Sequence, residues 1–318
     1  MGEEKIKLVK IDVEGAEIKV LEGLSGVIEK VSNLLVECHM DEDWGTIKDL
    51  LLNKYNFSCY DVQFESPVTI DTEERSYQCL CKKNNLIWVT GGAGFIGSHL
   101  VDKLISKGVS VIVLDNLSSG KEKNINPKAT HINVDLSTMD TKKLHWELYP
   151  MKFFKNVDTV FHLAATPQVQ YSIENPTDNN NLDSLINILD LSRIIEAKRF
   201  VFSSSSAVYG NPTYTPIDEN HPLNPLSPYA LHKLVGEQYC KLYSNLYNLD
   251  TVCLRYFNAY GNRMPNKGAY RSVISIFMEQ TEKNQLLNIV NDGEQKRDFV
   301  HVEDIVQANI LCAKSKNN

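Results

Sequence analysis

The sequence lacks any run of about 18 apolar residues, the length that a transmembrane helix needs. The first residues, Met1 to Lys5, have no apolar core of the kind found in secretory signals. Basic residues are fewer than acidic ones, with 33 Lys and Arg against 40 Asp and Glu, so the composition does not favour binding to nucleic acid. These absences argue against membrane and nucleic-acid partners and predict a cytoplasmic protein.

Cysteines are few and dispersed. Seven are present, an odd number, and only Cys79 and Cys81 lie close together. No second pair stands at the spacing of a zinc site, so the sequence predicts no metal centre. Reduced thiols in the cytoplasm are the expected state.

The chain is long enough for two structural units. It has 318 residues, of which 42% are hydrophobic, so a sizeable core can form. A polar stretch from Lys82 to Asn85 stands between two strand-like runs. We therefore predict a boundary there, between a segment of residues 1–82 and a domain of residues 86–318.

The larger segment alternates between strand and helix patterns. Strands are expected at 86–90, 109–114, 131–134, 159–164, 199–203 and 250–255, and helices at 97–107, 182–196 and 228–247. Strands that alternate with helices form parallel sheets with right-handed crossovers. The predicted fold class is therefore α/β, with a doubly wound parallel sheet of the Rossmann type.

The smaller segment shows the same alternation at lesser length. Strands are expected at 6–13, 34–39, 57–62 and 76–81, and helices at 16–31 and 43–54. Four strands in about 80 residues are marginal for a free-standing α/β domain. A small, partial α/β segment is therefore predicted ahead of the larger domain.

A glycine-rich turn follows the first strand of the larger segment and opens a helix. Gly91 permits a tight turn, Gly94 allows the backbone to approach a pyrophosphate, and Gly97 lets helix and strand pack closely. The pattern predicts a dinucleotide phosphate on the helix N-terminus, where free N–H groups favour an anion. The alternative is a structural turn without a ligand. The candidate residues are Gly91, Gly94, Phe95, Ile96 and Gly97.

An acidic residue ends the next strand. Asp115 lies about 20 positions past the glycine turn, where a carboxylate can bind the ribose hydroxyls of a dinucleotide. The same charge would repel a 2′-phosphate, and Asn116, Leu117 and Ser118 supply no arginine to offset it. The sequence therefore favours NAD over NADP as the cofactor.

A tyrosine and a lysine stand one turn apart in the helix expected at 228–247. Tyr229 and Lys233 share a helix face, and the serines at 203–206 end a strand, where α/β sheets bind ligands. For Tyr229 to act as a base, its pKa must fall from about 10 to near neutrality, a change of ~4 kcal/mol that a nearby lysine and a cationic nicotinamide can supply. The pattern predicts proton removal from an alcohol during hydride transfer, and the alternative is a solvated helix face.

Residues from Leu86 onward resemble the extended short-chain dehydrogenases/reductases, and among them the NAD-dependent nucleotide-sugar epimerases and dehydratases. The matching motifs run in the family's order across about 220 residues. They are Thr90 to Ser98, Leu114 to Leu117, Val134 to Leu136, Phe161 to Ala165, Ser203 to Gly210, Ser227 to Lys233, Leu254 to Asn258 and Arg297 to Asp304.

The resemblance implies roles for individual residues. Ser205, Tyr229 and Lys233 would be the catalytic residues, with Ser205 orienting the substrate hydroxyl. Asn258 and Arg297 would bind the sugar diphosphate, Arg297 as a bidentate phosphate clamp. The alternative for Arg297 is a surface ion pair.

The resemblance also implies a cofactor site. Asp135 and Leu136 would contact adenine, Asn181 the ribose region, and Tyr256 the nicotinamide carboxamide. The implied cofactor-binding residues are Gly91, Gly94, Phe95, Ile96, Gly97, Asp115, Asn116, Asp135, Leu136, Ala164, Ala165, Asn181, Ser203, Tyr229, Lys233 and Tyr256.

The residues after Ser205 narrow the expected reaction. Family dehydratases carry Asp-Glu there and decarboxylases carry a glutamate in that stretch, whereas Ser206 and Ala207 cannot do acid–base work. The resemblance therefore implies a UDP-glucose 4-epimerase-like isomerase that interconverts UDP-hexoses through a 4-keto sugar, with Tyr229 as base and NAD as hydride carrier. The alternatives are a dehydratase or decarboxylase of the same family, or a catalytically silent NAD-binding fragment.

The resemblance further implies a nucleotide-sugar partner and a homodimer through the helices at 182–195 and 231–246. The family continues well beyond the motif that ends at Asp304, whereas this sequence stops at Asn318. A C-terminally truncated substrate lobe, from about residue 256 on, is therefore expected. Asn262 and Arg263 stand where the family has proline and arginine, which is a minor departure.

The N-terminal segment, residues 5–82, resembles the C-terminal half of an FkbM-type methyltransferase. The resemblance lies in Lys7 to Glu17 and in Leu34 to His39. The loop that would bind S-adenosylmethionine should precede this segment, and only a few residues do. A remnant, a truncated fusion or a partner-docking module is expected rather than methyl transfer. The carboxylates that could form a metal or substrate cluster are Asp12, Glu14, Glu17 and Glu37.

Overall fold

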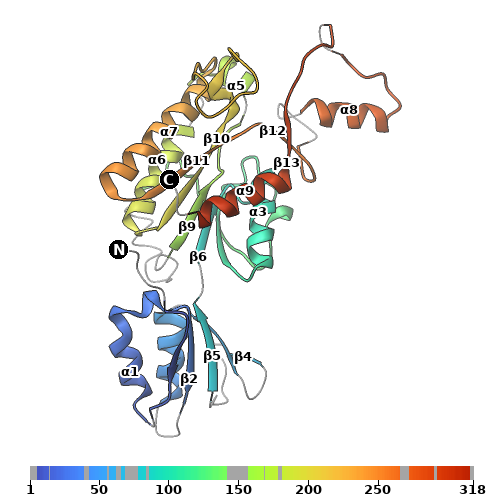
Figure 1. Cartoon of the computed structure of the whole chain (residues 1–318). Helices are drawn as coiled ribbons and strands as arrows, with labels where there is room; N and C mark the ends of the chain where they lie inside the picture. The colour runs from blue at the N-terminus through green and yellow to red at the C-terminus, as the bar shows by residue number, and fades with distance from the viewer. Residues whose placement is uncertain are drawn as a thin grey trace. The chain divides into compact units, whose positions relative to one another are not determined.

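The computed structural model divides the chain into two compact units, Met1–Asn85 and Leu86–Asn318 (Figure 1). Residues 6–13, 15–38, 43–55, 57–61, 66–68, 78–83, 86–141, 157–167, 169–177, 181–265, 272–289 and 292–315 are described. Within this described part, no helix is long and apolar enough to cross a bilayer.

The larger unit is built on a six-stranded parallel sheet. Its strands are β6 (Leu86–Thr90), β7 (Ser110–Leu114), β8 (Thr130–Ile132), β9 (Val157–His162), β10 (Arg199–Ser205) and β11 (Asp250–Tyr256). They lie in the order β11-β10-β9-β6-β7-β8, which confirms the predicted Rossmann-type sheet. The chain winds outward in one direction from β6 and in the other from β9. A doubly wound sheet binds ligands outside the carboxyl ends of the strands at this reversal.

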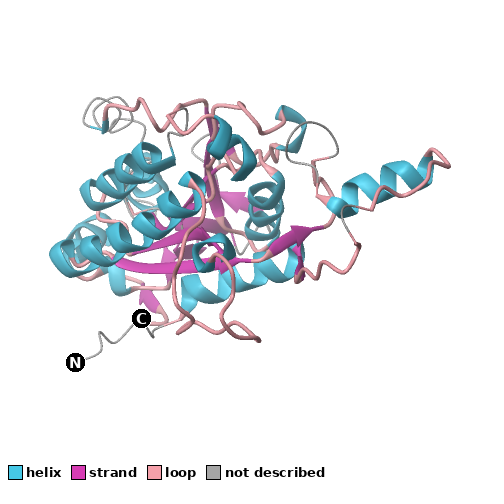
Figure 2. Ribbon diagram, turned by 90° about the horizontal axis from the view of Figure 1, so that it is seen from above, coloured by secondary structure: helices cyan, strands magenta, loops and turns pink. Residues whose placement is uncertain are grey.

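Helices cover both faces of this sheet (Figure 2). α6 (Asn181–Ile194) and α7 (Pro228–Tyr247) pack over one face, and α3 (Phe95–Ser106) and α9 (Val302–Lys314) over the other. Successive strand residues point to opposite faces, so Trp88 packs in the α6/α7 cluster and its neighbour Val89 in the α3/α9 cluster. Because both faces are covered, β6 and β7 at the middle of the sheet are nearly continuous apolar runs.

Helix α7 carries the predicted catalytic pair, and its ends are defined by local sequence. Ser227 caps it, with its hydroxyl accepting a hydrogen bond from the Ala230 N–H at 3.1 Å, and Pro228 occupies the first turn. Asn248 ends the helix in the left-handed region at φ 56°. The observed span matches the helix expected at 228–247.

Several elements of the larger unit were not among the sequence expectations. They are α5 (Val169–Glu174), α8 (Val273–Glu282), the parallel pair β12 (Asn258–Tyr260) and β13 (Phe299–His301), α9, and the 3₁₀ turns Glu122–Asn124 and Ser206–Tyr209. Helix α8 lies apart from the sheet in both views (Figures 1 and 2). The strand pair, α5 and the 3₁₀ turns are too short to show a clear periodicity, whereas α8 and α9, with 10 and 13 residues, are long enough to show one.

The smaller unit contains a five-stranded sheet with its own core. The order is β1-β2-β5-β3-β4, with β1 and β2 parallel and the other pairs antiparallel. The strands are β1 (Val9–Ile11), β2 (Asn33–Glu37), β3 (Phe57–Asp61), β4 (Ser66–Val68) and β5 (Gln78–Lys83). The expectation of four strands was wrong, because it omitted β4. This strand has three residues and is too short to show an alternating pattern.

The helices of the smaller unit are shorter than expected. In place of one helix at 16–31, α1 (Glu17–Gly23) is followed by the 3₁₀ turns Leu24–Gly26 and Ile28–Lys30. Glycine and β-branched residues at this point weaken a helix, which explains the break. α2 (Trp44–Lys48) begins at the Asp43 cap and continues as a π turn, Asp49–Lys54.

The cysteines and carboxylates were expected to be reduced thiols and a possible metal or substrate cluster. Cys59 is disulfide-bonded, so the prediction of reduced thiols was wrong at this position. Cys240, Cys253 and Cys312, which lie in the larger unit, are free thiols. Asp12 and Glu37 each pair with Lys10 at 3.1 Å, while Glu14 lies outside the described residues. Among described residues no cluster of His, Cys, Asp and Glu suits a metal ion.

Candidate active site

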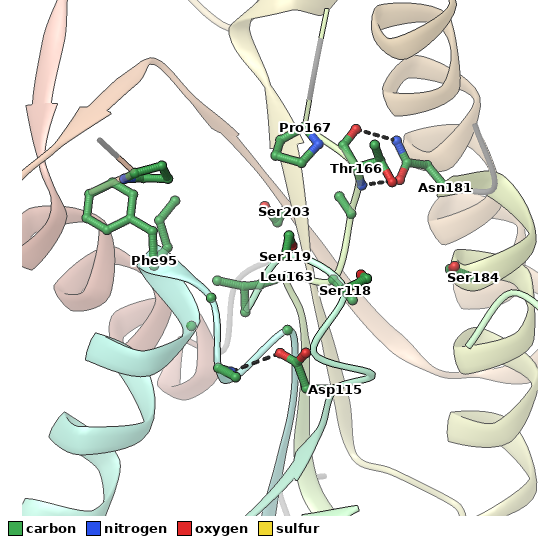
Figure 3. Close-up of a pocket in the computed structure, with 18 of the residues that line it drawn as sticks. Phe95, Asp115, Ser118, Ser119, Leu163, Thr166, Pro167, Asn181, Ser184 and Ser203 are labelled. Carbon is green, nitrogen blue, oxygen red and sulfur yellow. Dashed lines mark hydrogen bonds between the residues drawn. The ribbon is translucent and has the colours of Figure 1, made fainter. Parts of the chain in front are cut away.

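A cavity of about 1190 Å³ opens at the carboxyl ends of β6, β9 and β10 (Figure 3). It brings together every predicted site residue except Arg297. The predicted residues that line it are Gly91, Gly94, Phe95, Ile96, Gly97, Asp115, Asn116, Asp135, Leu136, Ala164, Ala165, Asn181, Ser203, Ser205, Tyr229, Lys233, Tyr256 and Asn258.

The glycine turn between β6 and α3 has the close packing of a phosphate-binding loop. Gly91 has φ 70°, and a Cβ there would lie 2.7 Å from the backbone nitrogen of Ala164. A Cβ on Gly97 would overlap the carbonyl oxygen of Gly91. Gly94 caps α3 without a side-chain hydrogen bond, so first-turn N–H groups are available for an anion. These residues fit a dinucleotide pyrophosphate.

Asp115 braces this turn against the end of β7. Its Oδ2 accepts a hydrogen bond from the Ala93 N–H at 2.9 Å (Figure 3). Its Oδ1 accepts one from the Leu117 N–H at 2.8 Å. A carboxylate offers about four acceptor positions, so ribose hydroxyls can still be bound. The carboxylate therefore holds the turn in place, a role that the sequence did not indicate.

Asp135 is held as a carboxylate at the adenine end of the predicted site. The Ser137 hydroxyl donates to it at 2.7 Å and the Ser137 N–H at 2.9 Å, and the Asn116 amide donates at 3.2 Å. These hydrogen bonds, led by the Ser137 hydroxyl, lower the pKa of Asp135 below its usual value.

Asn181 shapes the cavity through the backbone of Thr166. Its Oδ1 accepts a hydrogen bond from the Thr166 N–H at 2.7 Å, and its Nδ2 donates to the Thr166 carbonyl at 3.1 Å (Figure 3). This reciprocal pair fixes the segment that follows β9. Further residues that the sequence did not single out also line the cavity. Ser118, Ser119, Thr166 and Pro167 lie just after predicted strands, a place that was a usable signal, and Ser184 lies on α6.

Tyr229, Lys233 and Ser205 meet at one wall of the cavity. The Lys233 Nζ lies 5.8 Å from the centre of the Tyr229 ring and donates a hydrogen bond to the Ser203 carbonyl at 2.6 Å. Burial lowers the pKa of Lys233 to about 8. Burial raises the pKa of Tyr229, and a hydrogen bond with Ser205 opposes that rise. In the protein alone Tyr229 is therefore a neutral phenol, and its activation needs additional positive charge.

Tyr256 is a buried neutral phenol at the end of β11. Burial raises its pKa, and its hydroxyl lies 2.9 Å from Oδ1 and 2.7 Å from Nδ2 of Asn309. Asn309 sits on α9 and is 1% exposed. The sequence did not indicate this contact, because a lone asparagine in a helical pattern gives no signal of a partner 53 positions away.

The two residues expected to bind the sugar diphosphate differ in position. Asn258 lines the cavity and donates from Nδ2 to the Asp298 carbonyl at 2.7 Å. Arg297 is exposed, is not part of the cavity wall, and donates to the Lys296 carbonyl at 2.8 Å. The expected phosphate clamp is therefore not assembled around Arg297 in this structure.

Comparison with known proteins identifies the class that this fold and site define. Residues 87–318 match the NAD dependent epimerase/dehydratase family, and residues 1–59 match the methyltransferase FkbM domain. The chain belongs to the NAD-dependent epimerase/dehydratase family.

Relatives share the larger unit. A Methanocaldococcus jannaschii protein with the provisional name UDP-glucose 4-epimerase is 49% identical over 236 residues, 73% of this chain and 74% of that protein. The UDP-N-acetylglucosamine 4-epimerase of Methanobrevibacter ruminantium, solved with UDP-N-acetylmuramic acid, is 40% identical with TM-score 0.68, covering 74% of this chain and 75% of that one. The Thermus thermophilus UDP-glucose 4-epimerase, solved with NAD, is 35% identical with TM-score 0.65, covering 72% and 75%.

Proposed function

We propose that this protein interconverts UDP-hexoses at C4, with NAD as the hydride carrier. The observation that carries the proposal is the meeting of Ser205, Tyr229 and Lys233 on the wall of the cavity that the glycine turn also lines. The positions after Ser205 hold Ser206 and Ala207 in a 3₁₀ turn, so the acids that a dehydration requires are missing from that place.

In the proposed reaction, the Tyr229 oxygen takes the proton of the C4 hydroxyl while Ser205 orients that hydroxyl. Lys233, protonated below its pKa of about 8, stabilises the tyrosinate that Tyr229 becomes. NAD, when bound, would supply the acceptor for the C4 hydride, and because that hydride would return to the sugar, no cofactor would be consumed. After the 4-keto sugar turns over in the cavity, Tyr229 would return the proton to the C4 oxygen while C4 takes back the hydride on its opposite face, which inverts the configuration at C4.

The carboxylate of Asp115 supports NAD rather than NADP, because its charge at the ribose end of the cavity would repel a 2′-phosphate.

A homodimer through α7 is part of the proposal. Leu231, Leu242 and Leu246 are exposed along that helix at 48%, 47% and 62%, a spacing that places them on one stripe. We further propose a cytoplasmic location.

The test is direct conversion of candidate substrates. UDP-glucose, UDP-N-acetylglucosamine and UDP-glucuronate are incubated with the protein in separate reactions, and the products are separated by chromatography. We expect C4 epimers from at least one of them, without net reduction of NAD. If NAD is retained and none of the three is converted, the protein is an NAD-binding module and the proposal fails.

Tyr229→Phe tests the assigned base. We expect at least a 1,000-fold loss of turnover, on the order of a general base's contribution, with NAD still bound. Tyr239→Phe removes a hydroxyl from the same helix, where the ring packs against the core, and serves as the matched control. Turnover that survives in the Tyr229 variant would show that another group accepts the proton.

A further inference from the structure

Glu237 is a buried carboxylate that the proposed reaction does not use. It lies on α7 one turn after Lys233 and is 9% exposed. Its Oε1 accepts hydrogen bonds from the Ser204 hydroxyl at 2.6 Å and from Arg255 Nε at 2.9 Å. Its Oε2 accepts one from Arg255 Nη2 at 2.7 Å. The ion pair of Glu237 needs only Arg255, so the hydrogen bond from Ser204 requires a separate explanation.

That contact completes a row of three between α7 and the end of β10. Side chains four apart lie along one face of a helix, and Tyr229, Lys233 and Glu237 have this spacing. Tyr229 is hydrogen-bonded to the side chain of Ser205, and Lys233 donates to the carbonyl of residue 203. Glu237 accepts a hydrogen bond from the hydroxyl of Ser204, the strand residue between those two. Three consecutive residues of the strand are thus tied to three successive turns of the helix.

Arg255 extends the same row to the neighbouring strand. Ser204 and Arg255 are register partners in the β10–β11 pair, and both turn toward α7 to bond Glu237. The Arg255 Nη1 also donates to the Tyr209 hydroxyl at 3.0 Å and to the Glu219 carbonyl at 3.3 Å. The carboxylate therefore joins the helix to two strands and to the loop that leaves β10.

We propose that Glu237 is a positioning residue for the epimerisation. Through Ser204 and Arg255 it holds the end of β10 against α7, so that the Ser205 hydroxyl stays within hydrogen-bonding reach of Tyr229. This inference rests on the proposed function. A misplacement of reacting groups by a fraction of an ångström is enough to slow a reaction several-fold.

The decisive variant is Ser204→Ala, because it leaves the ion pair of Glu237 and Arg255 intact. We expect kcat to fall about tenfold, with KM for the sugar and Kd for NAD within about a factor of two. The matched control is Ser192→Ala on α6. Ser192 is fully buried, and its hydroxyl donates to the Ile188 carbonyl at 2.6 Å, away from the cavity. Equal kcat in the Ser204 and Ser192 variants would overturn the inference.

Glu237 itself is tested by a conservative pair of variants. Glu237→Gln keeps an acceptor for the Ser204 hydroxyl and Glu237→Ala does not, while both lose the charge that pairs with Arg255. We expect kcat of the Gln variant to exceed that of the Ala variant about tenfold at similar Tm. If kcat instead follows Tm across the two variants, Glu237 acts only on stability and the inference is wrong.

A third measurement needs no sugar, so it separates this inference from the proposed function. The rate at which acetic anhydride acetylates Lys233 is measured by mass spectrometry in the full chain. Loosening of β10 from α7 in Ser204→Ala should raise that rate about threefold, because the lysine becomes less buried. If Lys233 is labelled faster in Ser204→Ala but the wild type converts no sugar, the proposed epimerase function is rejected and the positioning role of Glu237 is kept. If the wild type is active but Ser204→Ala changes neither the labelling rate of Lys233 nor kcat, the positioning role is rejected and the epimerase function is kept.

Discussion

Replacing Lys233 by Met tests the electrostatic state of the active site. Lys233 is 4% exposed, and burial lowers the pKa of its ammonium group from 10.5 to about 8. The gap between these two values corresponds to about 3 kcal/mol of disfavoured charge in the folded state. Methionine has a similar shape and no charge, so it removes this electrostatic penalty together with the hydrogen bond to the Ser203 carbonyl.

The penalty has a defined pH window. Below pH 8 the lysine is protonated in both folded and unfolded chains, and the folded state bears the full cost. Between pH 8 and 10.5 the unfolded chain binds more protons than the folded one, so stability rises with pH. The unfolding free energy of the wild type, minus that of the variant, should therefore increase by about 3 kcal/mol across this window.

Urea unfolding followed by circular dichroism, from about pH 7.5 to about pH 10.5, measures this difference because titrations shared by both proteins cancel. Lys241→Met, on the exposed side of the same helix, is the control and should show no such trend. A flat difference for the Lys233 variant would refute the argument that its ammonium is buried at a cost. Activity of the wild type should decline above about pH 8, as Lys233 loses its proton.

Three further substitutions have expected outcomes. Gly97→Ala should abolish NAD binding in a titration calorimetry experiment, because its Cβ would overlap the Gly91 carbonyl; retained affinity would contradict that geometry. Asp115→Asn replaces one of two oxygens that accept backbone N–H groups, so Kd for NAD should rise at least about tenfold, and an unchanged Kd would argue against the brace. Asn309→Leu removes the buried partner of the Tyr256 hydroxyl and should lower the unfolding free energy by about 1–3 kcal/mol, measured by urea unfolding.

Local patterns predicted the frame of the larger unit well. The strand at 86–90 and the helix at 228–247 match β6 and α7 residue for residue. Apolar runs, glycine turns and helix caps depend on residues within a few positions of one another, so they can be read without knowing the fold. The same reasoning overextended the helix at 16–31, where glycine and β-branched residues break the pattern.

Contacts between distant segments were beyond that reasoning. The Glu237 carboxylate meets Ser204 across 33 positions, and Asn309 meets Tyr256 across 53. Neither pair leaves a local trace, because its geometry depends on how α7 and α9 pack on the sheet. Arg297 is exposed and lies outside the cavity wall, and its role as a phosphate clamp stays a prediction.

By itself the sequence determined which residues are able to do the chemistry and in which order they occur along the chain. The glycine turn, the acid at the end of β7 and the Tyr229/Lys233 pair follow from side-chain properties and short spacings. Only the tertiary structure decided how these groups are tuned. Burial sets the pKa of Lys233 and Tyr229, and long-range hydrogen bonds hold Asp115, Asn181 and their neighbours in place, because desolvation and orientation arise only once helices close over the sheet.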